Sequence, residues 1–135
     1  MDPGRRGPDP LAWSDPRAWI VAGLALVFLA LGGLFVAAPG PAAALFGIPA
    51  PENAGRAYIP AIGFRDLALG LYLIGLLIWS GRPALRVVLG ASIVIPLCDV
   101  CLVALTSGSN AIWQIALHAV SGLVLLAVWL SLRSS

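Results

Sequence analysis

Four long apolar stretches, separated by polar or Pro- and Gly-rich segments, dominate the sequence. They cover residues 18–38, 59–79, 84–105 and 111–130. Each has roughly 20 residues, which is the length that an apolar helix needs to cross a hydrocarbon core of about 30 Å. The pattern therefore predicts an all-α fold, a bundle of four transmembrane helices within residues 18–132.

The segments between these stretches predict how the helices connect. The turn sequences at 80–83 and 107–110 are short, so we expect the last three helices to be antiparallel neighbours. The long, Pro-rich connection 39–58 predicts an outer loop with a short helix in the membrane interface. Residues 1–17 contain much Pro, Gly and charge, and we expect this segment to be disordered and cytoplasmic.

Composition supports a membrane location and excludes several other classes of protein. Hydrophobic residues make up 60% of the chain and charged residues 10%, whereas about 25% of a soluble domain is charged. A soluble enzyme of this composition would expose very large apolar patches. The arginines are not accompanied by lysines and form no basic stripe, so we expect membrane lipids, and no nucleic acid, as partners.

The distribution of arginine predicts the orientation in the membrane. One side of the predicted bundle carries six of them: Arg5, Arg6, Arg17, Arg82, Arg86 and Arg133. The opposite side carries Arg56, while Arg65 lies inside a helix. By the positive-inside rule, we expect a multi-pass protein of the cell (inner) membrane with both termini in the cytoplasm.

Four ionisable side chains lie inside the apolar stretches: Arg65, Asp66, Asp99 and His118. A rise of 1.5 Å per residue places each of them about 9–10 Å below the outer end of its helix. An unpaired charge at such a depth costs roughly 2.5–3.5 kcal/mol, so these groups must face one another or water. We take all four as candidate catalytic residues. Asp99 and His118 would act as acid and base, Arg65 would hold an anion, and Asp66 would orient its neighbours.

Four further polar side chains share helical faces with this layer and are candidate ligand-binding residues: Gln114, Ser92, Tyr72 and Ser121. The first and last lie one turn from the histidine, and the other two lie two turns from Asp99 or Arg65. Together these residues predict a polar pocket in the outer leaflet that binds a small lipophilic molecule. A single histidine with scattered carboxylates does not form a convincing metal site, and the pattern requires no cofactor.

Two features of the third stretch allow more than one interpretation. Cys98 and Cys101 form a CxxC motif, but reactive motifs of this kind lie at helix amino termini, and this one lies toward a carboxyl end. We expect both to be small buried apolar residues. Pro96 predicts a kink in the same helix.

Several short runs resemble a known family. They are residues 44–49 (Ala-Leu-Phe-Gly-Ile-Pro), 63–70 (opening Gly-Phe-Arg-Asp), 95–99 (Ile-Pro-Leu-Cys-Asp) and the Leu117–His118 pair. The family consists of small four-helix membrane proteins classed as a domain of unknown function and is similar to DoxX-like membrane proteins. The resemblance covers roughly residues 19–132 and implies a four-helix fold with a shared set of Arg65, Asp66, Asp99 and His118. DoxX-like relatives imply quinone-linked redox work, but this chain has no haem-ligand pair.

The leading hypothesis is a membrane protein whose outer-leaflet pocket binds a small lipophilic molecule and performs acid–base chemistry of the isomerase or cyclase type. Two alternatives remain: an oligomeric proton-coupled transporter, and a non-catalytic accessory subunit that docks a membrane partner. The ionisable layer would then serve transport or would only lock the helices in register.

Overall fold

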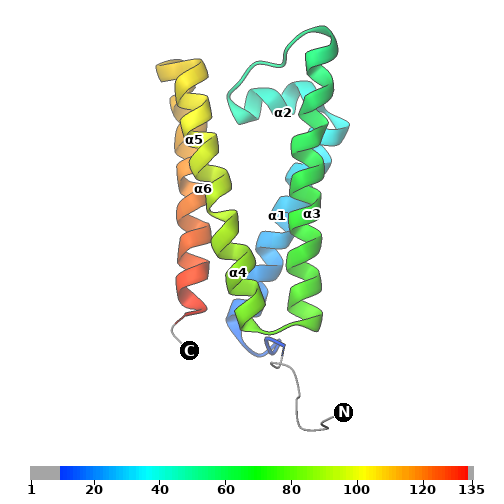
Figure 1. Cartoon of the computed structure of the whole chain (residues 1–135), viewed down its shortest axis with the longest axis vertical. Helices are drawn as coiled ribbons and strands as arrows, with labels where there is room; N and C mark the ends of the chain where they lie inside the picture. The colour runs from blue at the N-terminus through cyan, green and yellow to red at the C-terminus, as the bar shows by residue number, and fades with distance from the viewer. Residues whose placement is uncertain (1–9, 134–135) are drawn as a thin grey trace.

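The computed structural model describes residues 10–133, and the regular structure in that part of the chain is helical. The elements are α1 (Pro16–Ala37), α2 (Pro39–Phe46), α3 (Ile59–Trp79), α4 (Arg82–Ser92), α5 (Val94–Ser107) and α6 (Ile112–Ser131), with 3₁₀ turns η1 (Asn53–Tyr58) and η2 (Gly108–Ala111) (Figure 1). The predicted all-α class is therefore confirmed.

Three helical stretches are long and apolar enough to cross a membrane: Pro16–Ala37, Gly55–Trp79 and Arg82–Ser131. The third stretch folds back on itself, because α5 and α6 run in opposite directions and pack together (Figure 1). Gly108 makes this reversal with a φ of 56°, a backbone conformation that glycine adopts without the steric cost of a side chain.

The predicted helix 84–105 is divided in two. α4 ends at Ser92 and α5 begins at Val94, where the sequence had predicted only a kink at Pro96. Proline has no amide N–H, so the carbonyl of Ser92 lacks its usual donor four residues later. The helical hydrogen bonds are interrupted at this point, and the two halves take slightly different courses (Figure 1).

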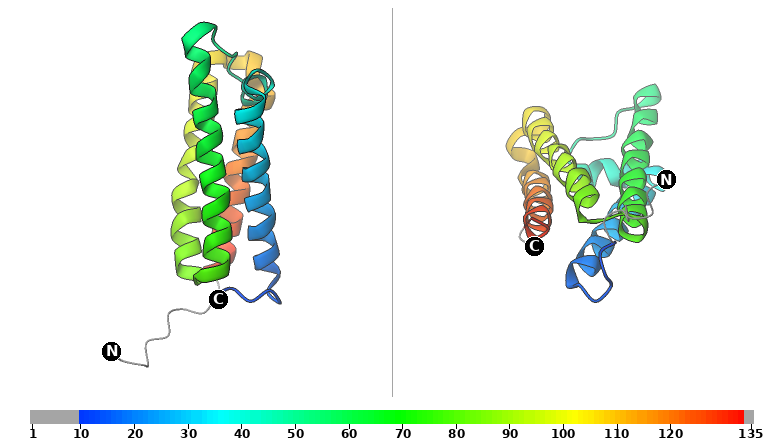
Figure 2. Two further views of the ribbon diagram at one scale, coloured as in Figure 1. Left: turned by 90° about the vertical axis from the view of Figure 1, so that its right-hand side faces the viewer. Right: turned by 60° about the horizontal axis from the view of Figure 1, so that its bottom comes forward.

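Two pairs of helices form the body of the molecule. α1 packs along α3, and α5 packs along α6 (Figures 1 and 2). In the first pair the backbones touch at Gly32 and Gly63. A Cβ atom added to Gly63 would lie 2.6 Å from the carbonyl oxygen of Gly32, and a Cβ on Gly32 would lie 2.7 Å from that of Gly63. Such close approach is typical of small residues at helix contacts in membranes.

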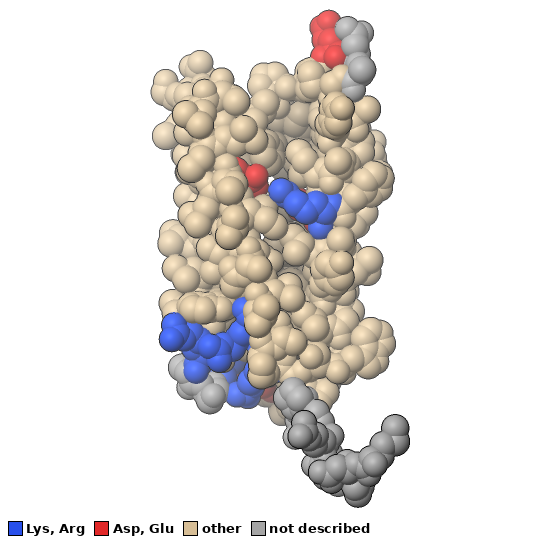
Figure 3. All heavy atoms as spheres, viewed as in Figure 1, with Lys and Arg blue, Asp and Glu red and all other residues tan. Residues whose placement is uncertain are grey.

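The pairs meet at the end of the molecule that holds the α3–α4 turn, which we call the closed end. Its core is a cluster of buried apolar residues: Leu11, Ala18, Val21, Ala25, Leu73, Leu77, Leu85, Leu89, Leu125, Val128 and Leu132. Arginine side chains gather at this end, and at mid-height basic and acidic atoms lie side by side (Figure 3). We call the opposite end, with α2 and η2, the cavity end.

The segment that precedes α1 packs against the closed end as far as it is described. Leu11 is buried, and the Asp15 carboxylate accepts hydrogen bonds from the Arg17 backbone N–H (3.0 Å) and from Arg82 Nη2 (2.9 Å). Disorder was expected over 1–17, but these contacts hold residues 10–17 in place. Residues 1–9 lie outside the described part of the chain.

Candidate functional site

A cavity of about 490 Å³ separates the two helix pairs beneath α2. Its walls come from α1, α2, α3, α5 and α6, with Ser92 from the end of α4, and are mostly apolar. The polar wall residues are Arg65, Asp66, Ser92, Asp99, His118 and Ser121. A volume of this size falls in the range of ligand pockets, in which a few polar groups orient a largely apolar ligand.

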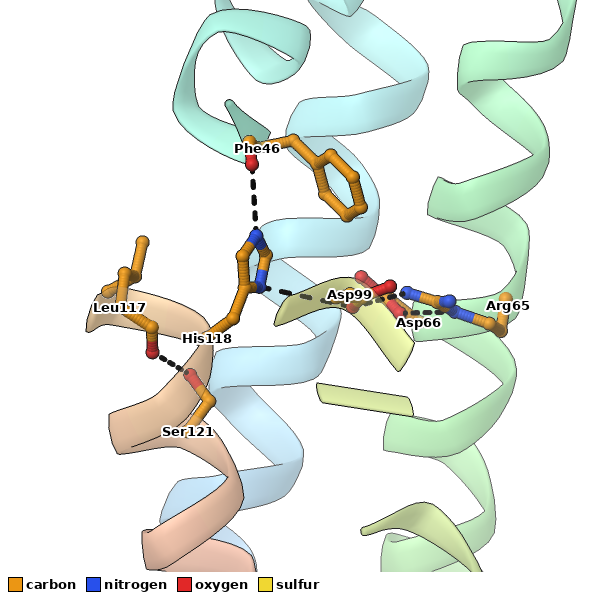
Figure 4. Close-up of polar contacts among 7 residues, drawn as sticks. All are labelled: Phe46, Arg65, Asp66, Asp99, Leu117, His118 and Ser121. Carbon is orange, nitrogen blue, oxygen red and sulfur yellow. Dashed lines mark hydrogen bonds and ion pairs between the residues drawn. The ribbon is translucent and has the colours of Figure 1, made fainter. Parts of the chain in front are cut away.

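The ionisable side chains form a row that crosses the cavity from α3 through α5 to α6 (Figure 4). Arg65 Nε donates to Asp66 Oδ1 at 3.1 Å, and its Nη2 lies 3.9 Å from Asp99 Oδ2. His118 Nδ1 lies 3.9 Å from the same Asp99 oxygen. The four groups expected at one depth are thus brought together in the described structure.

Arg65 and Asp66 contact each other although they are neighbours on one helix. Successive residues of an α-helix point about 100° apart, but the long arginine stem bends back so that its guanidinium reaches the adjacent carboxylate. The guanidinium therefore faces two carboxylates. The sequence had assigned it to an anionic group of a ligand, and in this geometry its charge is already balanced within the protein.

His118 is held by the end of α2. Its Nε2 lies 2.9 Å from the carbonyl oxygen of Phe46, and the two rings meet edge to face with centroids 4.8 Å apart. Phe46 is the last residue of α2, so no helical N–H occupies its carbonyl. The hydrophobic and charge patterns of the sequence do not mark Phe46 as part of a site. The signal that could have pointed to it is the helix-ending Gly47, which has a φ of 98°.

The contact with Phe46 fixes the tautomer of a neutral His118. A carbonyl oxygen only accepts hydrogen bonds, so the proton is on Nε2 and Nδ1 presents a lone pair toward Asp99. Two acceptors then face each other at 3.9 Å, too far apart for a direct hydrogen bond. A hydrogen-bond donor placed between them would bridge both acceptors.

The serine hydroxyls extend the acceptor character of the cavity. Ser92 donates to the carbonyl of Val88 at 2.8 Å, and Ser121 donates to that of Leu117 at 2.9 Å (Figure 4). Because each hydroxyl proton is used within its own helix, both oxygens keep lone pairs that can accept a hydrogen bond from a ligand.

Two of the candidate ligand-binding residues lie outside the cavity wall. Gln114 contacts α2 instead, with its Nε2 3.4 Å from the carbonyl of Ala44. Gly47 packs so closely on Gln114 that an added Cβ would lie 2.6 Å from the glutamine Cβ. Tyr72 is 62% exposed on the outer face of α3. Gln114 therefore supports α2 from α6, and Tyr72 lies on the exposed outer surface of α3.

Both cysteines are exposed, where the sequence had predicted buried side chains. Cys98 lies one residue before Asp99 and Cys101 two residues after it, so their side chains point about 100° and about 160° away from that of Asp99, which lines the cavity. In a bilayer this outer face meets lipid, which a small apolar thiol tolerates. Within residues 10–133, no three His, Cys, Asp or Glu side chains are grouped so that they could hold a metal ion.

Comparison with known proteins identifies one family. The family model described as "Domain of unknown function (DUF4267)" matches residues 25–132, which include α2 to α6, most of α1 and every wall of the cavity except Leu24. No curated protein and no solved structure matches the chain.

Proposed function

The chain belongs to the DUF4267 family, a domain of unknown function, and we propose that it binds a small lipophilic molecule in the cavity and catalyses proton transfer on it. The reaction would be of the isomerase or cyclase type. The observation that carries this proposal is the Asp99–His118 pair, two facing proton acceptors in a cavity whose walls are mostly apolar.

The proposal includes a placement in the membrane. In it, α1, α3, α4–α5 and α6 each cross the bilayer, since even α6 with its 20 residues is about 30 Å long. The arginine-rich closed end faces the cytoplasm of a cell (inner) membrane, so both termini are cytoplasmic and the cavity lies in the outer leaflet. The similarity to DoxX-like proteins belongs to this proposal and extends to the helical fold alone, because the chain has one histidine and its cysteines face outward.

The residues take distinct roles in this mechanism. His118, oriented by the Phe46 carbonyl, accepts a proton at Nδ1, and Asp99 is the second proton acceptor and donor. Arg65 is a positioning residue that holds Asp66 and Asp99 in the row. A double-bond shift removes one proton from the ligand and adds one at another atom, so the proton that His118 Nδ1 takes up can be returned by His118 or through Asp99, and no further reactant is needed.

The structure supports the transporter alternative less well. A carrier needs a polar path on both sides of its binding site, but the space between the cavity and the arginine-rich end is filled by Leu73, Leu77, Leu85 and Leu89. No described contact favours the accessory-subunit alternative over ligand binding.

Co-purification tests the binding part of the proposal. Wild type, Asp99→Asn, His118→Gln and the control Tyr72→Phe would be purified in lipid nanodiscs and their bound lipophilic molecules identified by mass spectrometry. We expect wild type and control to retain the same molecule, and the two site variants to retain about tenfold less. Equal retention by all four folded proteins would contradict the proposal.

Isotope exchange tests the catalytic part. Nanodiscs holding the retained molecule would be incubated in D₂O, and its deuterium content followed by mass spectrometry. Wild type is expected to introduce deuterium at carbon, because a proton removed by His118 is replaced from solvent-exchanged groups. Asp99→Asn is expected to introduce little. If the wild type retains the molecule but introduces no deuterium into it, the protein binds the molecule without catalysing proton transfer, and the catalytic part of the proposal is wrong.

A further inference from the structure

The cavity opens sideways, toward the position of the lipid chains. Five of its apolar wall residues are also exposed on the outside of the molecule: Val27 (54%), Leu45 (41%), Leu117 (46%), Val120 (56%) and Val124 (46%). They belong to α1, α2 and α6, so an apolar opening lies between α1 and α6, beneath α2. Its rim is apolar, which suits passage of a hydrocarbon chain and not of a free polar solute.

The opening runs along α6 and ends at the ionisable row. From Leu117 to Val124 the helix rises about 10 Å, and His118 stands at the upper end of this run. Toward the closed end, Leu125 is buried in the apolar core and ends the cavity. A ligand that fits this shape has a slender apolar chain in the opening and a compact head group beside His118.

The charges in the cavity restrict the head group. With both carboxylates ionised and the imidazole neutral, Arg65, Asp66 and Asp99 carry a formal net charge of −1, and the guanidinium lies toward both carboxylates. Apart from the Nη groups of Arg65, which lie on the side of Asp66 and Asp99, the polar atoms left for a ligand are acceptors: His118 Nδ1, Asp99 Oδ2 and two serine oxygens. In surroundings of low dielectric constant an anionic head group would be repelled, whereas an N–H or O–H donor would bridge the two acceptors.

We propose that the ligand is a single-chain amphiphile whose head group is an alcohol or primary amine, and that it enters from the bilayer between α1 and α6. The shared chemistry of the two head groups is a hydrogen-bond donor without negative charge. This inference rests on the proposed function, since it names the ligand class for the same cavity.

Photolabelling tests the head group. Protein in phosphatidylcholine nanodiscs would be irradiated with hexadecyl probes that carry a diazirine in the chain and an amine, an alcohol or a carboxylate as head group. Labelled peptides would be counted by mass spectrometry. We expect the amine and alcohol probes to label the walls in α1 and α6 about fivefold more than the carboxylate. In Asp99→Asn, which removes the excess negative charge, the carboxylate should label as well as the alcohol.

A matched pair of tryptophan variants tests the entrance. Val120→Trp places a large ring at the mouth of the cavity, and Leu123→Trp places the same ring on the outer face of α6, where the side chain is 65% exposed and does not line the cavity. Val120→Trp should lower labelling by the amine probe about fivefold, and Leu123→Trp should leave it unchanged. An equal loss of labelling in both variants would contradict an entrance between α1 and α6.

The outcomes separate this inference from the function on which it depends. Equal labelling of the cavity by all three probes would overturn the head-group class and leave the binding cavity in place. Strong labelling by the carboxylate alone would do the same. If no probe labels the cavity, the inference is overturned, and the co-purified molecule independently decides whether the cavity binds a lipophilic compound of another class.

Discussion

The closed end and the cavity end share α1, α3 and α6 but differ in what lies between the helix pairs. At the closed end, fully buried side chains such as Leu85 and Leu89 fill the space between the helix pairs. At the cavity end, the walls are also lined by leucine, valine and phenylalanine, yet about 490 Å³ stays open. A shortage of apolar side chains therefore does not explain the cavity.

The difference lies in what holds the helices apart. In a bilayer, apolar side chains gain little by leaving the lipid, so helix association depends on close packing and on polar contacts. At the cavity end, α2 is inserted as a spacer that contacts α6 through His118 and Gln114. The ionisable row adds contacts between α3, α5 and α6 across the gap. The comparison predicts that packing defects will damage stability most, and that changes in the row will damage binding.

The largest loss of stability is expected where the backbones touch. Gly63→Leu would force a side chain against the carbonyl of Gly32, and overpacking of this kind costs about 3 kcal/mol or more because a backbone cannot move aside. Gly33→Leu is the control, since no atom lies within 4 Å of a Cβ added there. Unfolding titrations in detergent would measure both. A folded, equally stable Gly63→Leu would show that the α1–α3 contact is looser than described.

The next largest effect compares one leucine from each end. Leu89→Ala should cost about 2 kcal/mol, the lower part of the usual range, because the unfolded helix keeps its apolar surface in lipid and only packing is lost. Leu31→Ala should cost clearly less, because Leu31 borders space that is already empty. Equal losses in the same titration would show that the cavity end is as tightly packed as the closed end.

The sequence predicted the long helices well and the orientation of their faces poorly. α3 spans the predicted range, and α1 and α6 lie within two residues of theirs, because an uninterrupted apolar run is a strong signal. The side of each helix that faces the interior was harder to predict. A helix surrounded by lipid is apolar on every side, so its pattern does not show which side turns inward. Tyr72 and both cysteines were therefore expected near the interior but lie outside.

The contact between α2 and His118 lay beyond sequence analysis for another reason. It depends on a backbone carbonyl of Phe46, which any residue type would provide, and on a helix end more than 70 positions away in the chain. The four ionisable residues could be found because charge is rare in apolar stretches. The backbone carbonyl of Phe46, which contacts His118, has no comparable signal in the sequence.

A smaller effect on stability is expected at Gln114, which contacts α2 from α6. Gln114→Ala removes one long hydrogen bond to Ala44 and the packing on Gly47, and should lower stability by about 1 kcal/mol. Because α2 positions the Phe46 carbonyl, the same variant should also weaken ligand retention a few-fold. Retention at the wild-type level would indicate that His118 keeps its orientation without this support.

The smallest effect on stability is expected for the ionisable row. Its size distinguishes a ligand-binding site from a set of ion pairs that only holds the helices in register. The triple variant Arg65→Met, Asp66→Leu and Asp99→Leu replaces the arginine and both carboxylates of the row by apolar side chains of similar size and keeps His118. Replacing a whole buried ionic set in this way is often neutral or stabilising, whereas removing one partner is not. We therefore expect the free energy of unfolding to stay within about 1 kcal/mol of the wild type, while ligand retention and deuterium exchange are lost. Arg65→Met alone is the matched control, since it leaves two carboxylates without their cation and should unfold more easily than the triple variant. A triple variant that no longer folds would mean that the row holds the helices in register, and the open space beneath α2 would then be a consequence of that lock.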